Sequence, residues 1–433
     1  MNVSTDFEAY LAPSRGPRAG RRADAATALA AIPDGGRVLI PTLCGVPERL
    51  LQALDEMRDR WSALEIVGGR LLDPIGPLQH PGAPFTFTTW QTGAGYNPAA
   101  AAGVLQVLPA QYSHTAGLFV ADGAYPVDAV LVQVSPPGPQ GHVSLGVSVG
   151  AVIDAVRSAP LVIAQVNASV PYTFGVSELS PDAFDFLVEM DGPLLELERA
   201  PPGPVAETIA GHVSSLVQDE ATLQFGIGAV PEAIMARLTQ RRDLGVHSGM
   251  ISDGLIDLVE SGALSNARKS IDAGVMVTAE VAGTRRLFNW VDRNPMVRMA
   301  PARYTHGPAV LARCHHLVAI NSAVQVSLDG SVNAEAIDGR LISGPGGQPD
   351  FALGVFLAQD GTGIVALPST AAGGQVSRIV RQLGPGAVVT VSRTLADRVV
   401  TEYGIAELRG RTLSQRADAL RAVAHPDFRQ ELA

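Results

Sequence analysis

Short apolar runs separated by longer amphipathic stretches are the feature that most limits what this chain can fold into. The runs are rich in Val, Ile and Leu, and they are RVLIP near 37, ALEIVGG near 63, AVLVQVS near 129, PLVIAQVN near 160, then TLQFGIG, LGVHSG, LVAINSA, GIVALPS and AVVTVS. Continuous apolar runs between helical stretches are typical of strands that are buried on both faces. The sequence therefore predicts an α/β fold with open, mainly parallel sheets, and it disfavours all-α and all-β folds.

The length of the chain predicts more than one hydrophobic core. Single cores stop growing near 250 to 300 residues, and this chain has 433. Three prolines around Gly203 (Pro201, Pro202 and Pro204) indicate a stiff extended linker before a new helix. We therefore expect an N-terminal domain over 1–203 and a C-terminal domain over 204–433, the second carrying the glycine loops and most of the site.

Two short sequence segments recur in the same order in both halves of the chain. CGVPERLLQAL at 44–54 returns as GAVPEAIMARL at 228–238, and VQVS at 132–135 returns at 324–327. Repeated words at similar spacing indicate a duplicated domain. Two similar α/β domains would form a cleft between their sheets, a usual place for a ligand site.

Composition excludes several classes of protein. The hydrophobic fraction of 46% excludes a disordered chain, and a net charge of −10 without basic runs gives no footprint for nucleic acid. The longest charge-free stretch, between Asp73 and Asp122, is interrupted by prolines and glycines and is not a membrane span. The N-terminal stretch has acidic residues before its arginines and reads as neither a signal nor a transit peptide. Cys44 and Cys314, the only cysteines, fit a reducing cytoplasm and no thiolate metal site.

Two glycine-rich turns are candidates for ligand binding. FGIGAVPEAI (225–234) puts Gly226 and Gly228 where a strand turns into a helix, and such a turn suits a phosphate or an oxyanion. Tight strand–helix packing explains it equally well. SGPGGQPDFALG (343–354) would let several backbone N–H groups approach a thioester carbonyl as an oxyanion hole, with a glycine-rich hairpin as the alternative. Its candidate residues are Gly344, Gly346, Gly347 and Gln348.

GVHSGMISDG (245–254) gathers His247, Ser248 and Asp253 at the end of a predicted strand, where α/β sites are assembled. Adjacent side chains on a strand point to opposite faces, so the Ser–His pair is not a hydrolase triad. For a similar reason His315 and His316 do not converge on one metal ion, and we expect no metal site.

Glu280 lies in the otherwise apolar run TAEVAG. Burying a carboxylate is costly unless it is paired or is kept for its chemistry with a raised pKa. A structural ion pair and a catalytic role are both consistent with the pattern.

Longer stretches carry a family resemblance over most of the chain, most densely in its C-terminal half. They are QVSPPGPQGHVSLG (133–146), AQVNASVP (164–171), QFGIGAVPEAI (224–234), GVHSGMISDGLIDL (245–258), AGTRRLFNWVDRNP (282–295), INSAVQVSLDGSVNAE (320–335), SGPGGQPDF (343–351), LPSTAAGGQVSRIV (367–380) and VVTEYGIAELRG (399–410). In them the chain resembles the acetyl-CoA hydrolase/transferase family, which includes 4-hydroxybutyrate and butyrate:acetate coenzyme A-transferases. The resemblance implies two class I CoA-transferase domains with the active site between them.

The resemblance also implies an acyl-CoA substrate and a glutamate that attacks the thioester, forms an acyl anhydride and then carries CoA as a glutamyl thioester. Relatives usually have that glutamate where this chain has Gly249. Three hypotheses follow. Glu280 could supply the carboxylate of a CoA-transferase; Glu280, His247 or Asp253 could activate water in an acyl-CoA hydrolase; or the protein could bind acyl-CoA without catalysis.

By the same resemblance, the second glycine loop holds the thioester and pantetheine, with the first glycine turn at the same cleft. Asn321 and Ser369 are further lining candidates. No tightly bound cofactor is expected, since CoA is the substrate, and the second substrate would be a small carboxylic acid or water. A cytoplasmic homodimer is the expected assembly.

Overall fold

The computed structural model of the protein describes residues 7–198 and 201–433. Residues 1–6, part of the N-terminal stretch, and residues 199–200, part of the predicted linker, lie outside the described residues. Contacts divide the chain into two compact units. Within the described residues, the N unit comprises residues 7–197 and 277–305, and the C unit comprises residue 198 with residues 201–276 and 306–433.

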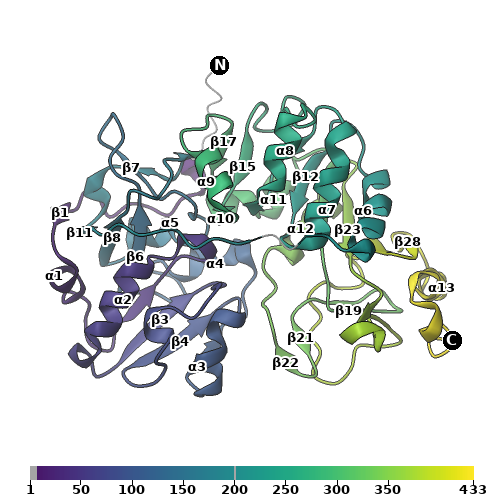
Figure 1. The fold of residues 1–433 in the computed structure, drawn as a ribbon, viewed down its shortest axis with the longest axis horizontal. Coiled ribbons are helices and arrows are strands. Elements are labelled where there is room, and N and C mark those ends of the chain that lie inside the picture. Colours follow the sequence, from purple (N-terminus) through teal and green to yellow (C-terminus); the bar gives the residue numbers. More distant parts are fainter. Residues whose placement is uncertain (1–6, 199–200) are drawn as a thin grey trace. The chain divides into compact units, whose positions relative to one another are not determined.

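The N unit is built on an eight-stranded sheet in which every neighbouring pair of strands is parallel. In spatial order its strands are β1 (Arg21–Arg22), β11 (Phe186–Glu189), β8 (Leu161–Val166), β6 (Ala129–Val134), β2 (Arg37–Leu39), β3 (Leu64–Gly68), β4 (Phe85–Thr89) and β5 (Leu105–Val107). All six residues of β6 are buried, as expected of a central strand that is covered on both faces. These strands run from purple through blue to teal in Figure 1.

Helices pack on this sheet through apolar faces. In α2 (Glu48–Glu56) the buried residues Leu50, Leu51 and Leu54 recur at helical spacing and join the core that contains Val38, Ile66 and Phe87. The other helices of the N unit are α1 (Ala25–Leu29), α3 (Asn97–Ala101), α4 (Tyr112–Leu118), α5 (Ile153–Ser158), α9 (Arg285–Val291) and α10 (Ala302–Thr305).

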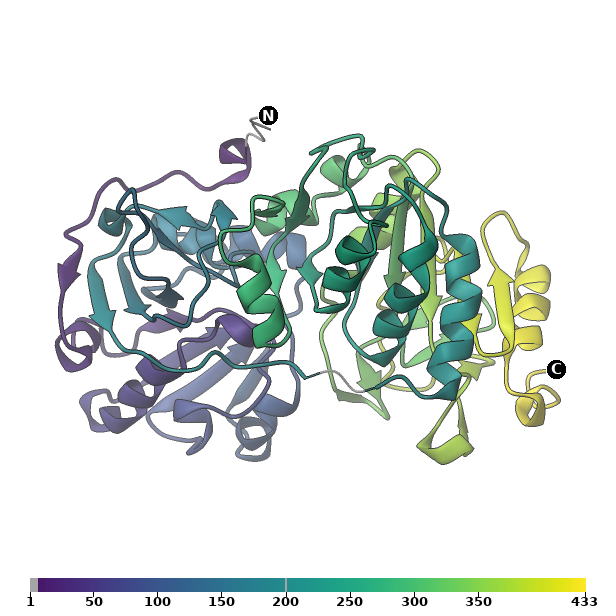
Figure 2. The ribbon, with the colours of Figure 1, turned by 45° about the horizontal axis from the view of Figure 1, so that its top comes forward.

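The C unit is built on a six-stranded sheet that is parallel except at its last strand. Its strands in spatial order are β13 (Gly245–Val246), β12 (Thr222–Phe225), β18 (Leu317–Asn321), β23 (Thr362–Ala366), β27 (Arg398–Thr401) and β28 (Gly404–Glu407). Its helices are α6 (Pro204–Leu216), α7 (Ala229–Arg237), α8 (Gly254–Glu260), α11 (Pro308–Leu311), α12 (Gln348–Leu357) and α13 (Leu413–Val423). Figure 2 shows α6, α7 and α8, in teal, side by side along the sheet.

The two sheets repeat one strand order. In the N unit the neighbours β3-β2-β6-β8-β11, and in the C unit the neighbours β13-β12-β18-β23-β27, both read 2-1-3-4-5 when numbered along the chain. The order reverses between the first and third strands of each set, and ligands of such sheets bind at the carboxyl ends of those strands. The prediction of an α/β fold with two similar, mainly parallel sheets is confirmed.

One segment crosses the boundary expected near residue 203. Residues 277–305 belong to the N unit, because β17 (Val297–Met299) pairs in parallel with β9 (Phe174–Gly175) and Val281 bonds to Val147. The two compact units are thus discontinuous along the chain, and the boundary between 1–203 and 204–433 stays a prediction. The repeated word at 44–54 and 228–238 falls on equivalent strand–helix turns, after β2 and after β12. The word VQVS does not, since it lies in β6 and in the peripheral β19 (Gln325–Ser327).

The prediction of a strand at AVVTVS (387–392) is wrong. The segment forms no strand, Val389 is 55% exposed, and Val391 alone makes a bridge, to Val332. A turn at Pro385–Gly386 directs the chain away from the sheet, and β27 takes the expected place. Among the described residues no helix is long and apolar enough to span a membrane.

Candidate active site

The second glycine loop of the C unit ends at the N-terminus of α12. Gly346 has φ +54°, which favours glycine, and Gly347 is the N-cap residue. Gln348 follows in the first turn, is 8% exposed, and within the described chain its Nε2 has no hydrogen-bond partner. A buried amide without a partner is rare in proteins and indicates a place for a water molecule or a ligand.

Asn321 ends β18 and shares a small cavity with Gln348. The volume of the cavity, ≈20 Å³, is enough for about one water molecule. Asn321 Nδ2 donates to Oε1 of Gln224 on β12 at 2.9 Å, and Gln224 Nε2 returns a longer bond of 3.4 Å. This amide pair lies where the strand order of the C-unit sheet reverses.

The first glycine turn lies beside this amide pair. The Gly226 N–H donates to the carbonyl of Ile320, and Gly228 has φ +124° as the N-cap residue of α7. A side chain at Gly228 would meet no atom within 4 Å, so backbone conformation rather than crowding requires glycine there. The turn therefore leaves space next to the N-terminus of α7.

His247 directly follows β13, and Asp253 directly precedes α8. His247 is fully buried, with Nδ1 3.9 Å from Oδ2 of Asp272, and Asp253 is the N-cap residue of α8. Both catalytic candidates are thus in the C unit, and their roles stay predictions.

Lys269, the only lysine of the chain, packs against β13. It is 6% exposed, packs on Gly245 and donates from Nζ to the carbonyl of Val275 at 2.7 Å. Burial lowers the pKa of Lys269 to about 8.

Gly249 and Gly347 both lie against the ring of His306, at the edge that carries Nε2. A Cβ added to either glycine would lie less than 3.0 Å from atoms of this imidazole. His306 is 4% exposed and makes an edge-to-face contact with Phe351 of α12, with ring centroids 5.0 Å apart. Burial lowers the pKa of His306 to about 3, so the ring is neutral at physiological pH.

Ser369 is held by a structural contact. Its Oγ donates to Oε1 of Glu402 at 2.6 Å and its backbone N–H donates to Oε2 at 2.9 Å. The side chain is fully buried, so both of its polar contacts serve to anchor the loop after β23. A lining role for Ser369 stays a prediction.

Glu280 lies in the N unit, in β16 (Glu280–Val281), which runs antiparallel to residues 147–149. It is 3% exposed, and Oε1 accepts a hydrogen bond of 2.5 Å from the hydroxyl of Tyr112 at the start of α4. Oε2 has no partner of good geometry among the described residues. Desolvation raises the pKa of Glu280 to about 8, although Ser148, Tyr112 and the Gly150 backbone favour the ionised form.

Glu280 lies near the loop that follows the carboxyl end of β2. Cys44 follows this strand, and burial, with a smaller contribution from the charge of Glu280, raises the pKa of its thiol to about 12. A Cβ on Gly45 would overlap the side chain of Ser148, which packs directly on this loop. Glu280 thus lies where the strand order of the N-unit sheet reverses, the position equivalent to that of the Gln224–Asn321 pair in the C unit.

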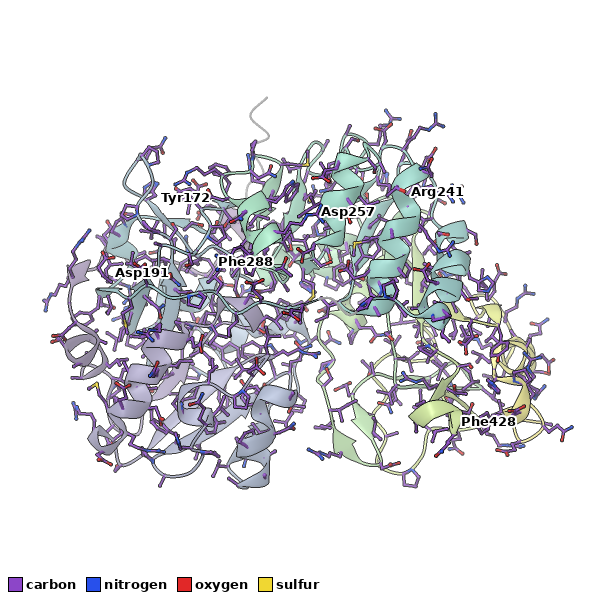
Figure 3. The ribbon with its side chains drawn as sticks, viewed as in Figure 1. Tyr172, Asp191, Arg241, Asp257, Phe288 and Phe428 are labelled. Atoms are coloured by element: carbon purple, nitrogen blue, oxygen red, sulfur yellow. The ribbon has the colours of Figure 1, made fainter. Side chains whose placement is uncertain are left out.

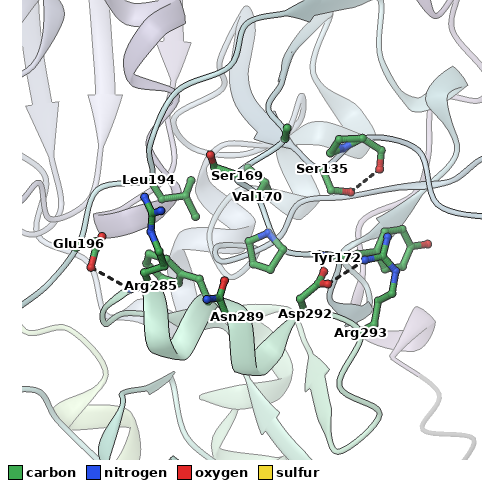
Figure 4. Close-up of a pocket in the computed structure, with 14 residues that line it drawn as sticks. Ser135, Ser169, Val170, Tyr172, Leu194, Glu196, Arg285, Asn289, Asp292 and Arg293 are labelled. Carbon is green, nitrogen blue, oxygen red and sulfur yellow. Dashed lines mark hydrogen bonds and ion pairs between the residues drawn. The ribbon is translucent and has the colours of Figure 1, made fainter.

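A separate cavity of ≈370 Å³ opens in the N unit at α9 (Figure 4). Its lining includes Tyr172 and Phe288, which are labelled in Figure 3, together with Arg285, Asp292 and Arg293. Asp292 accepts a bond from the Tyr172 backbone and pairs with Arg293. None of the site residues predicted from the sequence lines this cavity.

The structure therefore brings together some of the predicted residues. Gly347 and Gly249 meet at one ring, and Asn321 and Gln348 line one small cavity. His306, Gln224, Tyr112 and Glu402 were missed, because each of them takes its role from a contact with a residue that is distant in the sequence. A paired search for polar residues at the ends of predicted strands would have found Gln224. Within the described residues no group of three or more His, Cys, Asp or Glu side chains could hold a metal ion.

Comparisons with known proteins match nearly the whole chain. Residues 23–182 match the acetyl-CoA hydrolase/transferase N-terminal domain, and residues 283–433 match the corresponding C-terminal domain. The chain is 40% identical over 410 residues to 4-hydroxybutyrate coenzyme A transferase of Clostridium kluyveri, covering 94% of each chain.

Two solved structures are similar over the same length. One is RipA from Yersinia pestis, with 28% identity, a TM-score of 0.89, and coverage of 99% of this chain and 98% of that chain. The other is 4-hydroxybutyrate CoA-transferase from Porphyromonas gingivalis, with 30% identity, a TM-score of 0.79, and coverage of 95% and 96%.

Proposed function

Because the chain belongs to the acetyl-CoA hydrolase/transferase family and acts on acyl-CoA, we propose that it transfers coenzyme A from an acyl-CoA thioester to a small carboxylic acid. Acetate is the first acceptor to test. The similarity to 4-hydroxybutyrate coenzyme A transferase of Clostridium kluyveri covers 94% of each chain, which supports transfer ahead of hydrolysis.

The observation that carries the catalytic part of the proposal is the state of the Glu280 carboxyl group. It is buried, one oxygen is fixed by Tyr112, and the other has no partner of good geometry among the described residues. An arrangement of this kind destabilises the fold and is found where a carboxyl group is kept for its reactivity. We assign to Glu280 the role of the glutamate that is missing at position 249.

The chemistry follows from this assignment. The ionised Glu280 attacks the thioester carbonyl carbon, the C–S bond breaks, and CoA thiolate leaves an acyl–glutamyl anhydride. The thiolate then attacks the glutamyl carbonyl and releases the acyl group as a carboxylate, so that the enzyme carries CoA as a thioester. The acceptor carboxylate returns through the same two steps in reverse.

Oxyanion stabilisation is proposed separately, from observations within the C unit alone. The N-terminus of α12 presents backbone N–H groups, and the buried Gln348 amide has an N–H without a partner in the described chain. Donors of this kind stabilise negative charge on a carbonyl oxygen by roughly 3 kcal/mol each in the transition state. Gly344, Gly346, Gln348 and Asn321 are the residues that we propose for thioester binding.

Hydrolysis is the second candidate function, and the absence of a side chain at Gly249 favours it. Without a carboxylate there, water could be the acceptor, with Glu280, His247 or Asp253 as the base.

The test uses purified protein with a panel of short, branched and hydroxylated acyl-CoAs, each with and without acetate. Chromatography separates new acyl-CoA from free CoA. Transfer predicts new acyl-CoA only with acetate present, and loss of this product in Glu280→Gln. Asp154→Asn is the matched control, because Asp154 is also fully buried in the N unit with a pKa raised by desolvation. Free CoA without an acceptor would indicate a hydrolase, and binding without turnover across the panel would indicate an acyl-CoA-binding protein.

We further propose that the enzyme works in the cytoplasm as a homodimer. Cys44 and Cys314 are buried free thiols, which suits a reducing compartment. Light scattering coupled to size-exclusion chromatography tests the oligomeric state.

A further inference from the structure

His306 occupies space that a side chain at position 249 would need. A Cβ on Gly249 would lie less than 3.0 Å from Nε2 and Cε1 of the ring, and a Cβ on Gly347 less than 3.0 Å from Cδ2 and Nε2. All three residues belong to the C unit. Even alanine at either glycine therefore requires the imidazole to move.

The ring has little freedom to move. His306 is 4% exposed, Phe351 contacts it edge to face, and Phe351 is itself 1% exposed in the core of α12 and α11. The chain on either side of His306 is fixed by α10, which ends at Thr305, and by α11, which begins at Pro308. A buried ring packed in this way acts as a rigid spacer.

We propose that His306 fills the space that a side chain at position 249 would occupy: its ring excludes a carboxylate from position 249 and holds the N-terminus of α12 beside that position. In this role His306 is a positioning residue, and the inference rests on the proposed function for its chemical meaning.

The presence of the His306 ring instead of a glutamate side chain at position 249 changes the charge near the N-terminus of α12. A glutamate at 249 would lie close to the partial positive charge at the start of this helix and neutralise it. His306 is neutral, because burial lowers its pKa to about 3. The helix N-terminus consequently stays available for negative charge that develops on a bound thioester.

The packing half of the inference is tested by a double-mutant cycle on thermal unfolding. Gly249→Ala should lower the unfolding midpoint by about 5 °C in the parent protein and by much less in a His306→Ala background. Gly384→Ala is the control, since a Cβ there meets no atom within 4 Å and its effect should be the same in both backgrounds. Equal losses for Gly249→Ala with and without His306 would overturn the inference.

The chemical half is tested by restoring the carboxylate. Gly249→Glu and Gly249→Glu/His306→Ala are prepared in a Glu280→Gln background, checked for folding by circular dichroism, and incubated with butyryl-CoA without an acceptor. Intact-protein mass spectrometry then measures covalently bound CoA, which in this background does not depend on the role proposed for Glu280. The expected result is a CoA adduct on the variant that lacks the ring and at least a tenfold smaller amount on the variant that keeps it. Equal adduct on both, or none on the variant without the ring, would overturn the inference.

Discussion

The two units share a strand order but differ in how they use the carboxyl ends of their strands. In the N unit Gln133, at the end of β6, donates to the carbonyls of Cys44 and Val46 and accepts a bond from Asn167. In the C unit Asn321, at the end of β18, the strand that corresponds to β6, exchanges two hydrogen bonds with the side-chain amide of Gln224 on β12. The same topology thus supports a structural amide network in one unit and an open, glycine-lined strand end in the other.

The difference teaches that fold and site are set by different residues. The strand order follows from apolar runs and turns, which both halves share. The local chemistry follows from a few residues at the strand ends, such as Glu280 in the N unit and the glycines around His306 in the C unit. Three experiments can break or sharpen this contrast.

The largest expected effect on stability comes from Glu280, through its pKa. The unfolded value is near 4.5 and the folded value is about 8, so the folded state binds the proton more tightly. The contribution of the protonated group is therefore fully present below pH 4.5 and is lost as the pH rises towards 8, at up to about 1.4 kcal/mol per pH unit. Urea unfolding at pH 5, 7 and 9 should show Glu280→Gln gaining stability relative to the parent as the pH rises. A pH-independent difference between the two would mean that Glu280 is ionised in the folded protein.

A smaller effect should separate the two amide sites. Gln133→Leu leaves the carbonyl of Cys44 and the amide of Asn167 without their partner, and we expect a loss of about 2 to 4 kcal/mol in the free energy of unfolding. Gln224→Leu orphans only Asn321 and should cost about 1 kcal/mol, while raising KM for acyl-CoA. Removing both members, in Gln224→Leu/Asn321→Leu, should recover part of that stability but none of the affinity. Equal destabilisation at Gln133 and Gln224 would remove the contrast between the units.

The smallest effect is expected for Ser369→Ala. Loss of the Oγ bond to Glu402 should cost about 1 kcal/mol of stability, and the backbone bond to the same carboxylate remains. KM for acyl-CoA should stay unchanged if Ser369 only anchors its loop. A rise in KM without a change in stability would instead support the lining role that the sequence suggested.

Much of the fold was predictable because its signals are local. The runs at RVLIP, AVLVQVS, TLQFGIG and LVAINSA became β2, β6, β12 and β18, since continuous apolar segments between helices have few other ways to be buried. The run at AVVTVS failed because apolar content alone does not show whether the preceding turn leads into the sheet.

The site was only partly predictable. Glycines at helix starts and the carboxylate in an apolar run could be named from the sequence, as Gly347 and Glu280 were. The contact of His306 with Gly249 joins residues more than 50 positions apart, and no local pattern encodes it. The hydrogen bond from Tyr112 to Glu280 spans a still longer separation and depends on the segment 277–305 joining the N unit.

The burial of Lys269 has a practical consequence for handling the protein. Lys269 is the only lysine, so the other members of the 32 Lys and Arg residues are all arginines. The Lys269 side chain itself is only 6% exposed. Amine-directed crosslinkers and dyes therefore find no lysine target on the described surface of the folded chain. Modification of Lys269 by such a reagent would instead report the opening of the C unit, which makes this one amine a built-in probe of local unfolding.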